Sequence, residues 1–234
     1  MTFTDQTVLI TGAAGNLGRA VAHAFADRGA CLVLVDQSID RLERAFGPDG
    51  ARRCLAPANL LDGQEAGAAV QRGIERFARL DVVCNIAGGF RMGEPVHETS
   101  DATWNFLLDL NVRTMLNTVR AAVPHLIRRG AGKVVNVGAY AAQRGAAQMG
   151  AYCAAKSAVI RLTEAMAAEL REQGINVNCV LPTVIDTPEN RAAMPEADPA
   201  KWVAPEDLAS VVLFLASKAA RAVHGAAVPV TGLS

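Results

Sequence analysis

The sequence predicts an α/β domain, a seven-stranded parallel sheet with helices on both faces. Short runs rich in β-branched residues alternate with longer segments whose apolar residues recur at helical spacing. Parallel strands need crossover connections, which helices usually supply, so this alternation indicates a parallel sheet. The 234 residues, about half of them apolar, are enough for one domain with a large core.

The strands and helices are expected to alternate along the chain. Each strand is read from a short run of residues that prefer extended backbone, such as TVLI and CLVLV. In chain order, the strands are expected at 7–10, 31–35, 52–56, 81–84, 133–137, 176–180 and 227–230. Helices are expected where Ala-, Leu- and Arg-rich segments follow the helical period, at 16–28, 38–46, 62–78, 101–128, 151–172 and 205–217.

Residues 181–205 break this alternation. They contain five prolines and form a long irregular stretch between the sixth strand and the last helix. Such a stretch is usually functional in a compact domain, and parallel sheets bind ligands at the carboxyl ends of their strands. We therefore expect residues 183–204 to form a lid over a substrate site, with a surface loop of no function as the alternative. No repeat or linker divides the chain, so residues 1–234 are expected to form one domain.

Composition and charge exclude several classes of function. Basic and acidic residues number 23 each, with no block of like charge, which disfavours a nucleic-acid partner and favours a small, weakly charged substrate. The sequence has no long apolar run and no basic leader, so a cytoplasmic protein without membrane contact is expected. The five cysteines are scattered without metal-ligand spacing, and no metal site is expected.

The loop TGAAGNLG follows the first strand and opens the first helix. Glycines let backbone N–H groups approach a pyrophosphate, and the start of a helix carries partial positive charge. The loop contains Gly12, Gly15, Asn16, Leu17 and Gly18, and it predicts a dinucleotide site in a Rossmann-type doubly wound domain. A glycine-rich turn that only packs a helix against a strand is the alternative.

Asp36 ends the second strand, eighteen residues after Gly18. A carboxylate at this place can accept hydrogen bonds from both hydroxyls of an adenosine ribose, and it repels a 2′-phosphate. Neither Ala14 nor Gln37 is basic, so NAD(H) is favoured over NADP(H), with Arg41 as the nearest residue that could reverse this preference. A helix N-cap is the alternative role for Asp36.

Together these residues resemble the short-chain dehydrogenase/reductase family over nearly the whole chain. TGAAGNLG resembles the family's TGxxxGxG loop, NIAG at 85–88 resembles its NNAG, and Tyr152 with Lys156 matches its YxxxK. Asn111, Asn59-Leu60 and the segment 182–187, which resembles PGxxxT, extend the likeness. The resemblance implies the fold predicted above, a nicotinamide cofactor, and hydride transfer to or from a small organic substrate.

The resemblance also implies roles for individual residues. Tyr152 exchanges a proton with the substrate, Lys156 binds the nicotinamide ribose and lowers the tyrosine pKa, and Asn111 holds a water that relays protons. Residues four apart share a helix face, so the Tyr152 hydroxyl and the Lys156 ammonium can converge. The implied cofactor-binding residues are Gly12, Gly15, Asn16, Leu17, Gly18, Asp36, Asn59, Leu60, Asn85, Ala87, Gly88, Tyr152, Lys156, Pro182, Ile185 and Thr187.

One position departs from the family pattern. The family carries a Ser thirteen residues before the Tyr, in an N-[IV]-S-S segment, and its hydroxyl helps to bind the substrate oxygen; here that residue is Ala139. Removing one such donor typically lowers the rate by about 10² to 10³. Ala139, Tyr140 and Gln148 are the residues that we expect to face the substrate.

Three interpretations follow from Ala139. The dihydropteridine reductase branch of the family also has Ala there, and the segments 87–90, 138–156 and 181–198 resemble that branch, which implies a quinonoid dihydropterin substrate. Alternatively, the chain is a carbonyl or alcohol oxidoreductase in which Tyr140, Gln143 or Gln148 replaces the missing donor. In the third interpretation, it is an NAD-binding sensor or scaffold that has lost activity. The resemblance implies a homodimer or homotetramer in each case.

Overall fold

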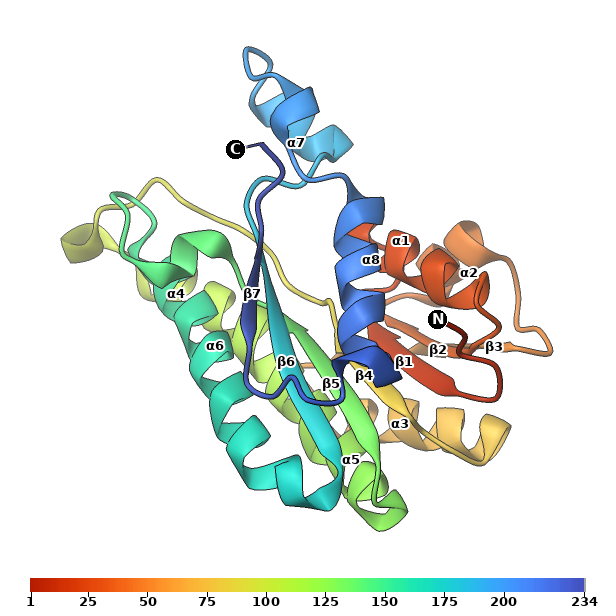
Figure 1. Cartoon of the computed structure of the whole chain (residues 1–234). Coiled ribbons are helices and arrows are strands. Elements are labelled where there is room, and N and C mark those ends of the chain that lie inside the picture. The colour runs from red at the N-terminus through yellow and green to blue at the C-terminus, as the bar shows by residue number, and fades with distance from the viewer. Residues whose placement is uncertain (234) are drawn as a thin grey trace.

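The fold is a seven-stranded sheet in which all neighbouring strands are parallel, in the order β3-β2-β1-β4-β5-β6-β7. The computed structural model describes residues 1–233. The strands are β1 (Thr7–Thr11), β2 (Cys31–Asp36), β3 (Arg53–Pro57), β4 (Val82–Asn85), β5 (Gly132–Val137), β6 (Ile175–Pro182) and β7 (Ala227–Val230). Each strand lies close to its predicted place, so the predicted parallel α/β sheet is confirmed (Figure 1).

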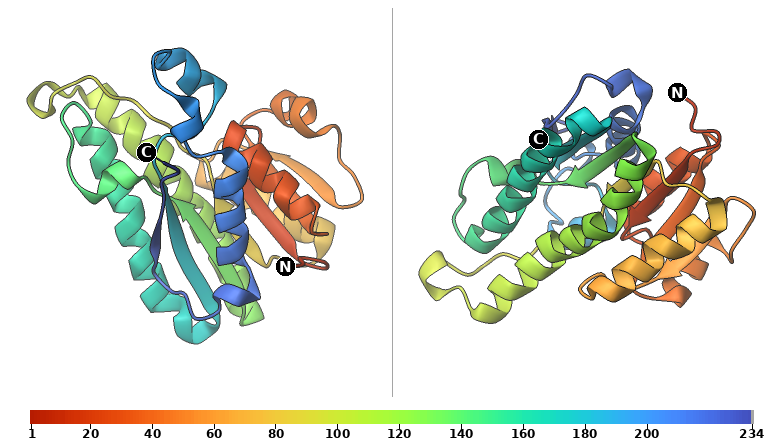
Figure 2. Two further views of the ribbon diagram at one scale, coloured as in Figure 1. Left: turned by 45° about the horizontal axis from the view of Figure 1, so that its top comes forward. Right: turned by 90° about the horizontal axis from the view of Figure 1, so that it is seen from below.

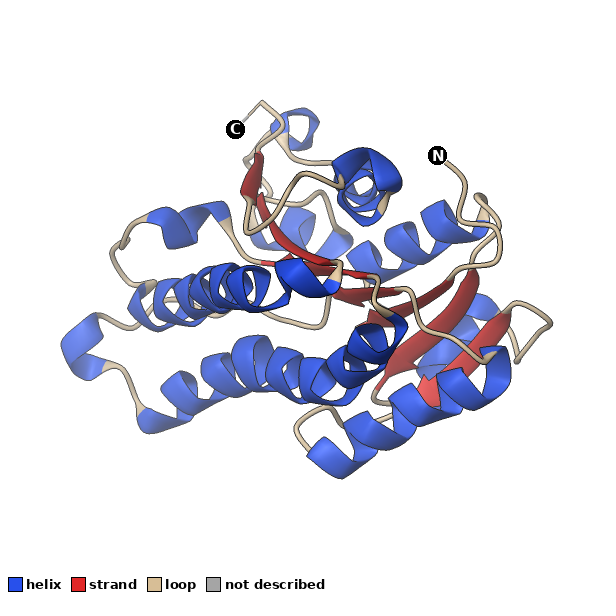
Figure 3. Cartoon of the chain, turned by 60° about the horizontal axis from the view of Figure 1, so that its bottom comes forward, coloured by secondary structure: helices blue, strands red, loops and turns tan. Residues whose placement is uncertain are grey.

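Helices cover both faces of the sheet, as Figure 3 shows. They are α1 (Asn16–Ala26), α2 (Ile39–Phe46), α3 (Gly63–Phe77), α4 (Asp101–Leu108), α5 (Thr114–Arg129), α6 (Gly150–Leu170), α7 (Pro188–Ala193) and α8 (Pro205–Ala216). Side chains of α1, α2 and α8 pack in one core, and those of α3, α5 and α6 pack in the other. Within residues 1–233, no helix combines the length and the apolar composition that crossing a membrane requires.

The two cores follow from the alternation of side chains along each strand. In β1, Val8 and Ile10 pack in the core that contains Phe25 of α1, whereas Leu9 packs in the core that contains Val70 of α3. Successive side chains of a strand point to opposite faces, so a strand covered on both sides is expected to be apolar at most positions. This is why the strand runs are nearly continuous apolar segments rather than alternating ones.

The helix predicted at 101–128 is not one regular helix. A π-helical turn at Asp109–Arg113 separates α4 from α5 and contains Asn111. The Asn111 side chain donates to the Leu107 carbonyl at 3.0 Å, and the Thr114 hydroxyl donates to the Leu110 carbonyl at 2.8 Å. Side-chain donors that compete for helix carbonyls disturb the regular ladder, and π-turns often lie at functional sites.

The segment predicted as an irregular lid contains a short helix, which the sequence reading did not expect. Helix α7 is capped by the Thr187 hydroxyl, which accepts from the backbone N–H of Asn190 at 3.2 Å. The base of the segment is fixed by a parallel bridge between Ile185 and Val203. Helix α7 and the turns beside it project from the carboxyl edge of the sheet (Figure 2).

Candidate active site

The residues predicted from the motifs gather along the carboxyl edge of the sheet. Gly12 follows β1, Asp36 ends β2, Asn59 follows β3, Asn85 ends β4 and Ala139 follows β5. The order of strands reverses between β1 and β4, because β2 and β3 lie on one side of β1 and the later strands lie on the other. Ligands of doubly wound sheets bind in the crevice at such a reversal, so the fold places these residues where a dinucleotide is expected.

The glycine-rich loop is packed so closely that side chains would not fit. Gly12 has a φ of +62°, and a Cβ there would lie 2.8 Å from the Ala87 Cα. A Cβ on Gly18 would lie 2.1 Å from the Gly12 carbonyl oxygen. Both contacts are too short to tolerate, so these two glycines are required by the packing of the loop. The close approach also brings the loop after β4 against the loop after β1.

The start of α1 is suited to an anion. Gly15 is the N-cap and offers no side chain, and the first turn contains no acidic residue. The first backbone N–H groups of a helix have no partner within the helix and carry partial positive charge. The loop therefore presents donors to a phosphate without a carboxylate of the first turn competing for them, which is the arrangement that a pyrophosphate requires. Leu17 is buried in the core beneath this turn.

Asp36 is buried at the end of β2 and is already held by several donors. Its Oδ2 accepts from the Ala14 N–H at 3.1 Å, and its Oδ1 accepts from the Gln37 N–H at 2.9 Å. Arg41 lies 3.1 Å from the same carboxylate and is about half exposed. The carboxylate thus ties the glycine-rich loop to β2, and Arg41, named from the sequence as the basic residue nearest to the ribose position, pairs with it.

Asn59 and Leu60 lie beyond the end of β3, on the same side of the crevice as Asp36. The Asn59 N–H donates to Glu65 of α3 at 2.7 Å, and the Leu60 carbonyl accepts from the Asn117 side chain at 2.9 Å. Leu60 is buried. These bonds attach the loop backbone to α3 and α5 on the side of the crevice where Asp36 lies.

Tyr152 and Lys156 lie on one face of α6, near its start, as their spacing predicts. The Phe90 ring packs edge-on against the Tyr152 ring, with centroids 4.8 Å apart. Among residues 1–233, no group hydrogen-bonds to the Tyr152 hydroxyl, which leaves it free to bind a ligand. Burial raises the pKa of Tyr152 to about 12, so the phenol is protonated at neutral pH.

Lys156 is almost entirely buried, with 5% of its surface exposed. Its ammonium donates to the Val137 carbonyl at 2.9 Å. Burial lowers the pKa of Lys156 to about 8. Burial thus shifts the pKa of Tyr152 upward, opposite to the lowering that the resemblance implies.

Asn111 connects the π-turn to the loop after β4. Its Oδ1 accepts from the Gly89 N–H at 3.1 Å, and its Nδ2 donates to the Gly89 carbonyl at 3.0 Å. A Cβ on Gly88 would lie 2.8 Å from Asn111 Oδ1 and 3.2 Å from Lys156 Nζ. Gly88 therefore brings Asn111 and Lys156 close together, since any side chain at this position would separate them.

A buried polar row lies beneath these residues. The Asn85 amide donates to Asn136 Oδ1 at 2.8 Å, and the Asn136 amide donates to the Thr163 hydroxyl at 2.8 Å. Asn85 Oδ1 is buried without a hydrogen-bond partner in the described part of the chain. Buried polar atoms are rarely left unpaired, and such exceptions concentrate at functional sites.

Residues 6–198 match the family described as short chain dehydrogenase. The chain belongs to the short-chain dehydrogenase family. It is 32% identical over 240 residues to a cis-4-hydroxycyclohexanecarboxylate dehydrogenase from Sinomonas cyclohexanicum, with 98% of this chain and 96% of that protein covered. The family assignment and the dehydrogenase relatives establish the chain as an oxidoreductase.

Two solved structures are also similar to this short-chain dehydrogenase. A carveol dehydrogenase from Mycobacterium avium in complex with NAD is 28% identical with a TM-score of 0.89, covering 98% of this chain and 97% of that one. A gluconate 5-dehydrogenase from Burkholderia cenocepacia J2315 in complex with NADP and tartrate is 27% identical with a TM-score of 0.90, covering 99% and 95%. Both nicotinamide cofactors therefore occur among structures of this fold.

Ala139 keeps this short-chain dehydrogenase distinct from the family pattern. It is 4% exposed and follows β5, next to the start of a 3₁₀ turn at Tyr140–Gln143. The preceding Gly138 cannot carry the other family serine, since a Cβ there would lie 2.7 Å from Leu181 Cδ2 and 2.9 Å from Cys179 Sγ. A single substitution at Ala139 is the way to restore a family hydroxyl here.

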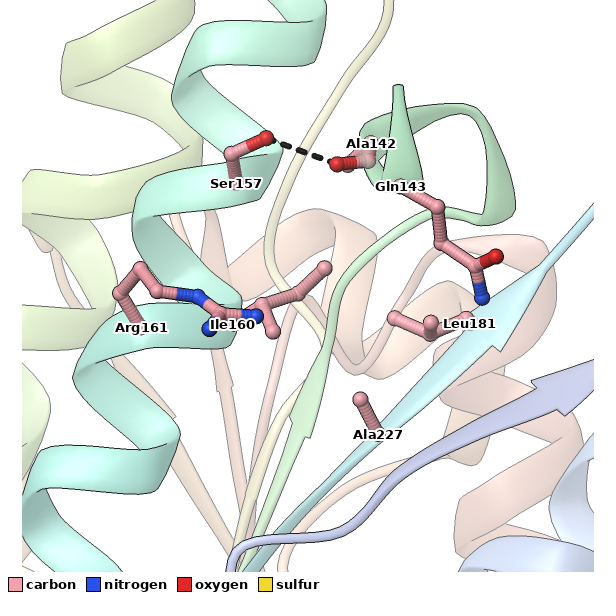
Figure 4. Close-up of a pocket in the computed structure, with 7 residues that line it drawn as sticks. All are labelled: Ala142, Gln143, Ser157, Ile160, Arg161, Leu181 and Ala227. Carbon is pink, nitrogen blue, oxygen red and sulfur yellow. Dashed lines mark hydrogen bonds between the residues drawn. The ribbon is translucent and has the colours of Figure 1, made fainter.

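The three candidate replacement donors lie in different places. Tyr140 and Gln148 are exposed, and Gln148 has a φ of +60°, uncommon for a residue other than glycine. Gln143 lines a separate hollow of about 540 Å³ and points toward Leu181 (Figure 4). Arg161 lines that hollow too, and it lies on the face of α6 opposite to Tyr152. Gln143 is therefore turned away from the candidate catalytic residues.

One side of the candidate site is built from the end of β6 and the segment that follows it. Pro182 ends that strand, Ile185 forms the bridge to Val203, and Thr187 caps α7. The Asn190 side chain donates to the Ile185 carbonyl at 2.8 Å. The backbone around Ile185 and the Thr187 hydroxyl are thus held in place, although Thr183 replaces the family glycine at the start of this turn.

Sequence reasoning missed two participants. Phe90 is the last residue of the segment 87–90, which sequence reasoning used only for its resemblance, but its ring packs on the Tyr152 ring. Glu189 was not singled out, but it accepts a hydrogen bond from Asn16 at 2.7 Å. Neither contact has a local signal, because the partners are far apart along the chain. Within residues 1–233, no group of three or more His, Cys, Asp and Glu side chains could hold a metal ion.

Proposed function

We propose that this short-chain dehydrogenase is an NAD(H)-dependent oxidoreductase in which Tyr152 exchanges a proton with the substrate oxygen. The observation that carries the proposal is the Tyr152 hydroxyl, which lacks a hydrogen-bond partner among the described residues and lies one helical turn from the buried Lys156. A partner-free proton donor beside a cation, at the ligand-binding edge of the sheet, is the arrangement that general acid–base catalysis needs.

The residues present fit a nicotinamide dinucleotide. The loop of Gly12 to Gly18 and the start of α1 would hold the pyrophosphate, and the Asp36 carboxylate would accept from the adenosine ribose. Lys156 would hold the nicotinamide ribose, and Thr187 with the Ile185 backbone would meet the carboxamide. When bound, the nicotinamide supplies or accepts the hydride.

NAD(H) is proposed as the preferred cofactor because of Asp36. Its carboxylate is 6% exposed at the end of β2, and a 2′-phosphate placed there would meet a negative charge. Arg41 pairs with the carboxylate at 3.1 Å, so the nearest cation is already engaged. Comparing kcat/KM for NADH and NADPH tests this preference, and a higher value with NADPH would reject it.

The protonation states of Tyr152 and Lys156 determine what these two side chains can do in the reaction. In the reductive direction the protonated Tyr152 phenol donates its proton to a carbonyl oxygen, and in the oxidative direction it must accept that proton. Burial raises the pKa of Tyr152 to about 12, so at neutral pH the proton donor is present and the phenolate is scarce. The Lys156 ammonium, close to Gly88 and Asn111, contributes positive charge at the same place.

For the substrate, we propose a small secondary alcohol or its ketone with an apolar body. Phe90 is 54% exposed and Met92 is 50% exposed, so the loop that carries Phe90 past Tyr152 presents an apolar surface. The names of the similar cis-4-hydroxycyclohexanecarboxylate and carveol dehydrogenases, both of which act on ring alcohols by their titles, support this class.

A quinonoid dihydropterin is the second candidate, and Ala139 is the observation that favours it. The side chain that the family uses as a second donor is a buried methyl group here. A quinonoid ring regains conjugation when it accepts hydride, so it needs less polarisation by hydrogen bonds than a simple ketone does.

The deciding experiment measures NADH oxidation by the purified protein with a cyclic ketone, a 3-ketoacyl thioester, a quinone and a quinonoid dihydropterin in parallel. We expect the highest kcat/KM with the cyclic ketone, because its apolar ring can pack against the apolar loop that carries Phe90. A much higher value with the dihydropterin would reject the ketone in favour of the second candidate. Failure to oxidise NADH with all four, in a protein that binds NADH, would contradict the proposed reaction.

We also propose that the chain forms a homodimer or homotetramer in the cytoplasm. The exposed Trp104 and Phe106 on α4 support the assembly, because large apolar side chains at the surface are typical of interfaces. Sedimentation analysis tests the assembly, and a monomer at micromolar concentration would contradict it. Cell fractionation tests the location.

A further inference from the structure

Asn16 is unusual within the loop that binds the pyrophosphate. In TGAAGNLG it occupies the second glycine position of the family pattern TGxxxGxG, so this chain has a side chain where that pattern has none. Asn16 is also the first residue of α1. Its amide nitrogen donates to Glu189 Oε2 at 2.7 Å, across 173 positions of the sequence.

Arg19 fixes the orientation of the Asn16 amide. One Arg19 guanidinium nitrogen donates to Asn16 Oδ1 at 2.8 Å. Because the amide oxygen already accepts from Arg19, the amide nitrogen is directed at Glu189. Hydrogen bonding at the Glu189 carboxylate lowers the pKa of Glu189, and the nearby Arg19 charge lowers it further. The pair is thus a charge-assisted hydrogen bond, and such bonds are stronger than neutral ones.

Glu189 belongs to the part of the lid that has few other attachments. No residue of α7 is buried. A hollow of about 730 Å³ separates this helix from α1 and α8, and Arg19, His23 and Arg191 line it together with Glu206. The ion pair between Arg191 and Asp186 and the bond from Asn190 to Ile185 lie within the lid itself. Packing therefore does little to hold α7 against the body.

Among the hydrogen bonds and ion pairs of residues 1–233, the bond between Asn16 and Glu189 is the one that joins residues 187–200 to the protein outside the lid segment 183–204. The base of the lid is fixed separately, by the Ile185–Val203 bridge and by the Asp186 N–H, which donates to the Val203 carbonyl at 2.8 Å. Residues 187–200 therefore have a single polar attachment outside the lid, and it is to the glycine-rich loop. Figure 1 places α7 at the carboxyl edge of the sheet, where that loop lies.

We propose that Asn16 and Glu189 form a latch that positions the lid over the dinucleotide and slows its release. The inference rests on the proposed dinucleotide site, because it needs a pyrophosphate bound at the start of α1. Thr187, which would meet the nicotinamide carboxamide, caps α7 and lies two residues before Glu189. Closing the latch therefore draws the nicotinamide side of the lid toward the pyrophosphate loop, and release of the dinucleotide requires the latch to open.

The test measures the rate at which NADH leaves the protein, by stopped-flow fluorescence after mixing with excess ADP-ribose. The variants are Asn16→Gly, which restores the family glycine, Glu189→Ala, and the double variant. Each single change should raise the release rate about fivefold, since it removes one charge-assisted hydrogen bond. The double variant should release NADH no faster than either single variant, because the two residues make the same contact.

Glu196→Ala is the matched control. Glu196 lies in the same lid, loses the same charge, and makes no hydrogen bond or ion pair within the described residues. We expect its release rate to equal that of the parent protein. In Glu189→Ala the steady-state KM for NADH should rise while the single-turnover rate with bound NADH stays the same, a split that general destabilisation would not produce.

Two results would overturn the latch. Unchanged or slower release in both single variants would show that the contact does not hold the dinucleotide, and additive effects in the double variant would show that the residues act separately. If the parent protein binds NADH and the variants release it normally, only the latch fails. If the parent protein does not bind NADH at all, the dinucleotide site fails and the latch fails with it.

Discussion

Polar side chains at the two ends of the parallel sheet differ in how fully they are hydrogen-bonded within the protein. At the amino end, Asp81 precedes β4 and is almost fully buried, but four donors satisfy its carboxylate. It accepts from the Thr7 N–H at 2.8 Å, from Arg79 in a two-bond pair at 2.8 Å each, and from Arg129. Both oxygens of the Asp81 carboxylate are therefore hydrogen-bonded within the protein, which leaves this group little capacity to bind a ligand.

At the carboxyl end, Asp36 is also held by several donors, but Asn85, Lys156 and the partly buried Tyr152 keep hydrogen-bonding capacity that the described residues do not use. The Tyr152 hydroxyl and Asn85 Oδ1 have no hydrogen-bond partner among the described residues, and the Lys156 ammonium makes one bond, to the Val137 carbonyl. An ammonium can donate three hydrogen bonds, so Lys156 has donors to offer to a ligand. Unpaired capacity costs stability, and proteins retain it mainly where they bind or react.

This difference allows residues that stabilise the fold to be distinguished from residues that act in turnover. Polar residues at the amino end should affect stability without affecting turnover, and those at the carboxyl end should do the reverse. Four predictions test that separation, beginning with the largest effect.

Tyr152→Phe should lower turnover by about 10³-fold, because it removes the proton donor and leaves the ring that packs on Phe90. The melting temperature and NADH affinity should stay close to those of the parent protein. Steady-state rates with the best substrate of the panel, together with an NADH titration, measure both. Turnover close to that of the parent would reject Tyr152 as the acid.

Asp81→Asn should lower the free energy of unfolding by about 3 kcal/mol, because it leaves Arg79 and Arg129 without their shared carboxylate. Urea denaturation measures the change. At a temperature where the variant is folded, kcat should match that of the parent protein, since Asp81 lies at the end of the sheet opposite to Tyr152. A clear loss of kcat in the folded variant would break the separation of the two ends.

The pH dependence of reduction should follow Lys156. Burial lowers the pKa of Lys156 to about 8, so the ammonium is present below that pH and is lost as the pH rises through it. Tyr152, with its pKa raised to about 12, stays protonated over the same range. We expect kcat/KM for NADH to fall by about tenfold per pH unit above the Lys156 pKa. A profile that stays flat or rises between pH 8 and pH 10 would contradict this assignment.

Ala139→Ser should raise kcat with a simple ketone by about fivefold, because it places a second donor where the family has one. The adjacent Gly138 is unsuitable for the same purpose, since a Cβ there would clash with Leu181 and Cys179. An unchanged or lower kcat would indicate that another donor, Tyr140 or Gln148, already binds the substrate oxygen. Turnover of the substrate panel by parent and variant measures the effect.

The sequence by itself determined the sheet, the helices and the chemical class of the site. Apolar runs of strand length that alternate with helical segments favour a parallel sheet covered on both faces, and the four-residue spacing of Tyr152 and Lys156 places both on one helix face. The glycine pattern likewise specifies a close backbone approach wherever it occurs. These features are local, so the order of residues is enough to predict them.

Only the tertiary structure decided how the polar groups pair. The bonds from Lys156 to Val137 and from Asn16 to Glu189 join residues that the sequence does not place together. Packing also decides that the Gln143 side chain lines a separate hollow and that a π-turn forms at Asn111. A side chain's partner depends on which elements meet in space, and its pKa depends on how completely they exclude water. The sequence therefore shows which groups are present, and the fold decides which of them remain free to act.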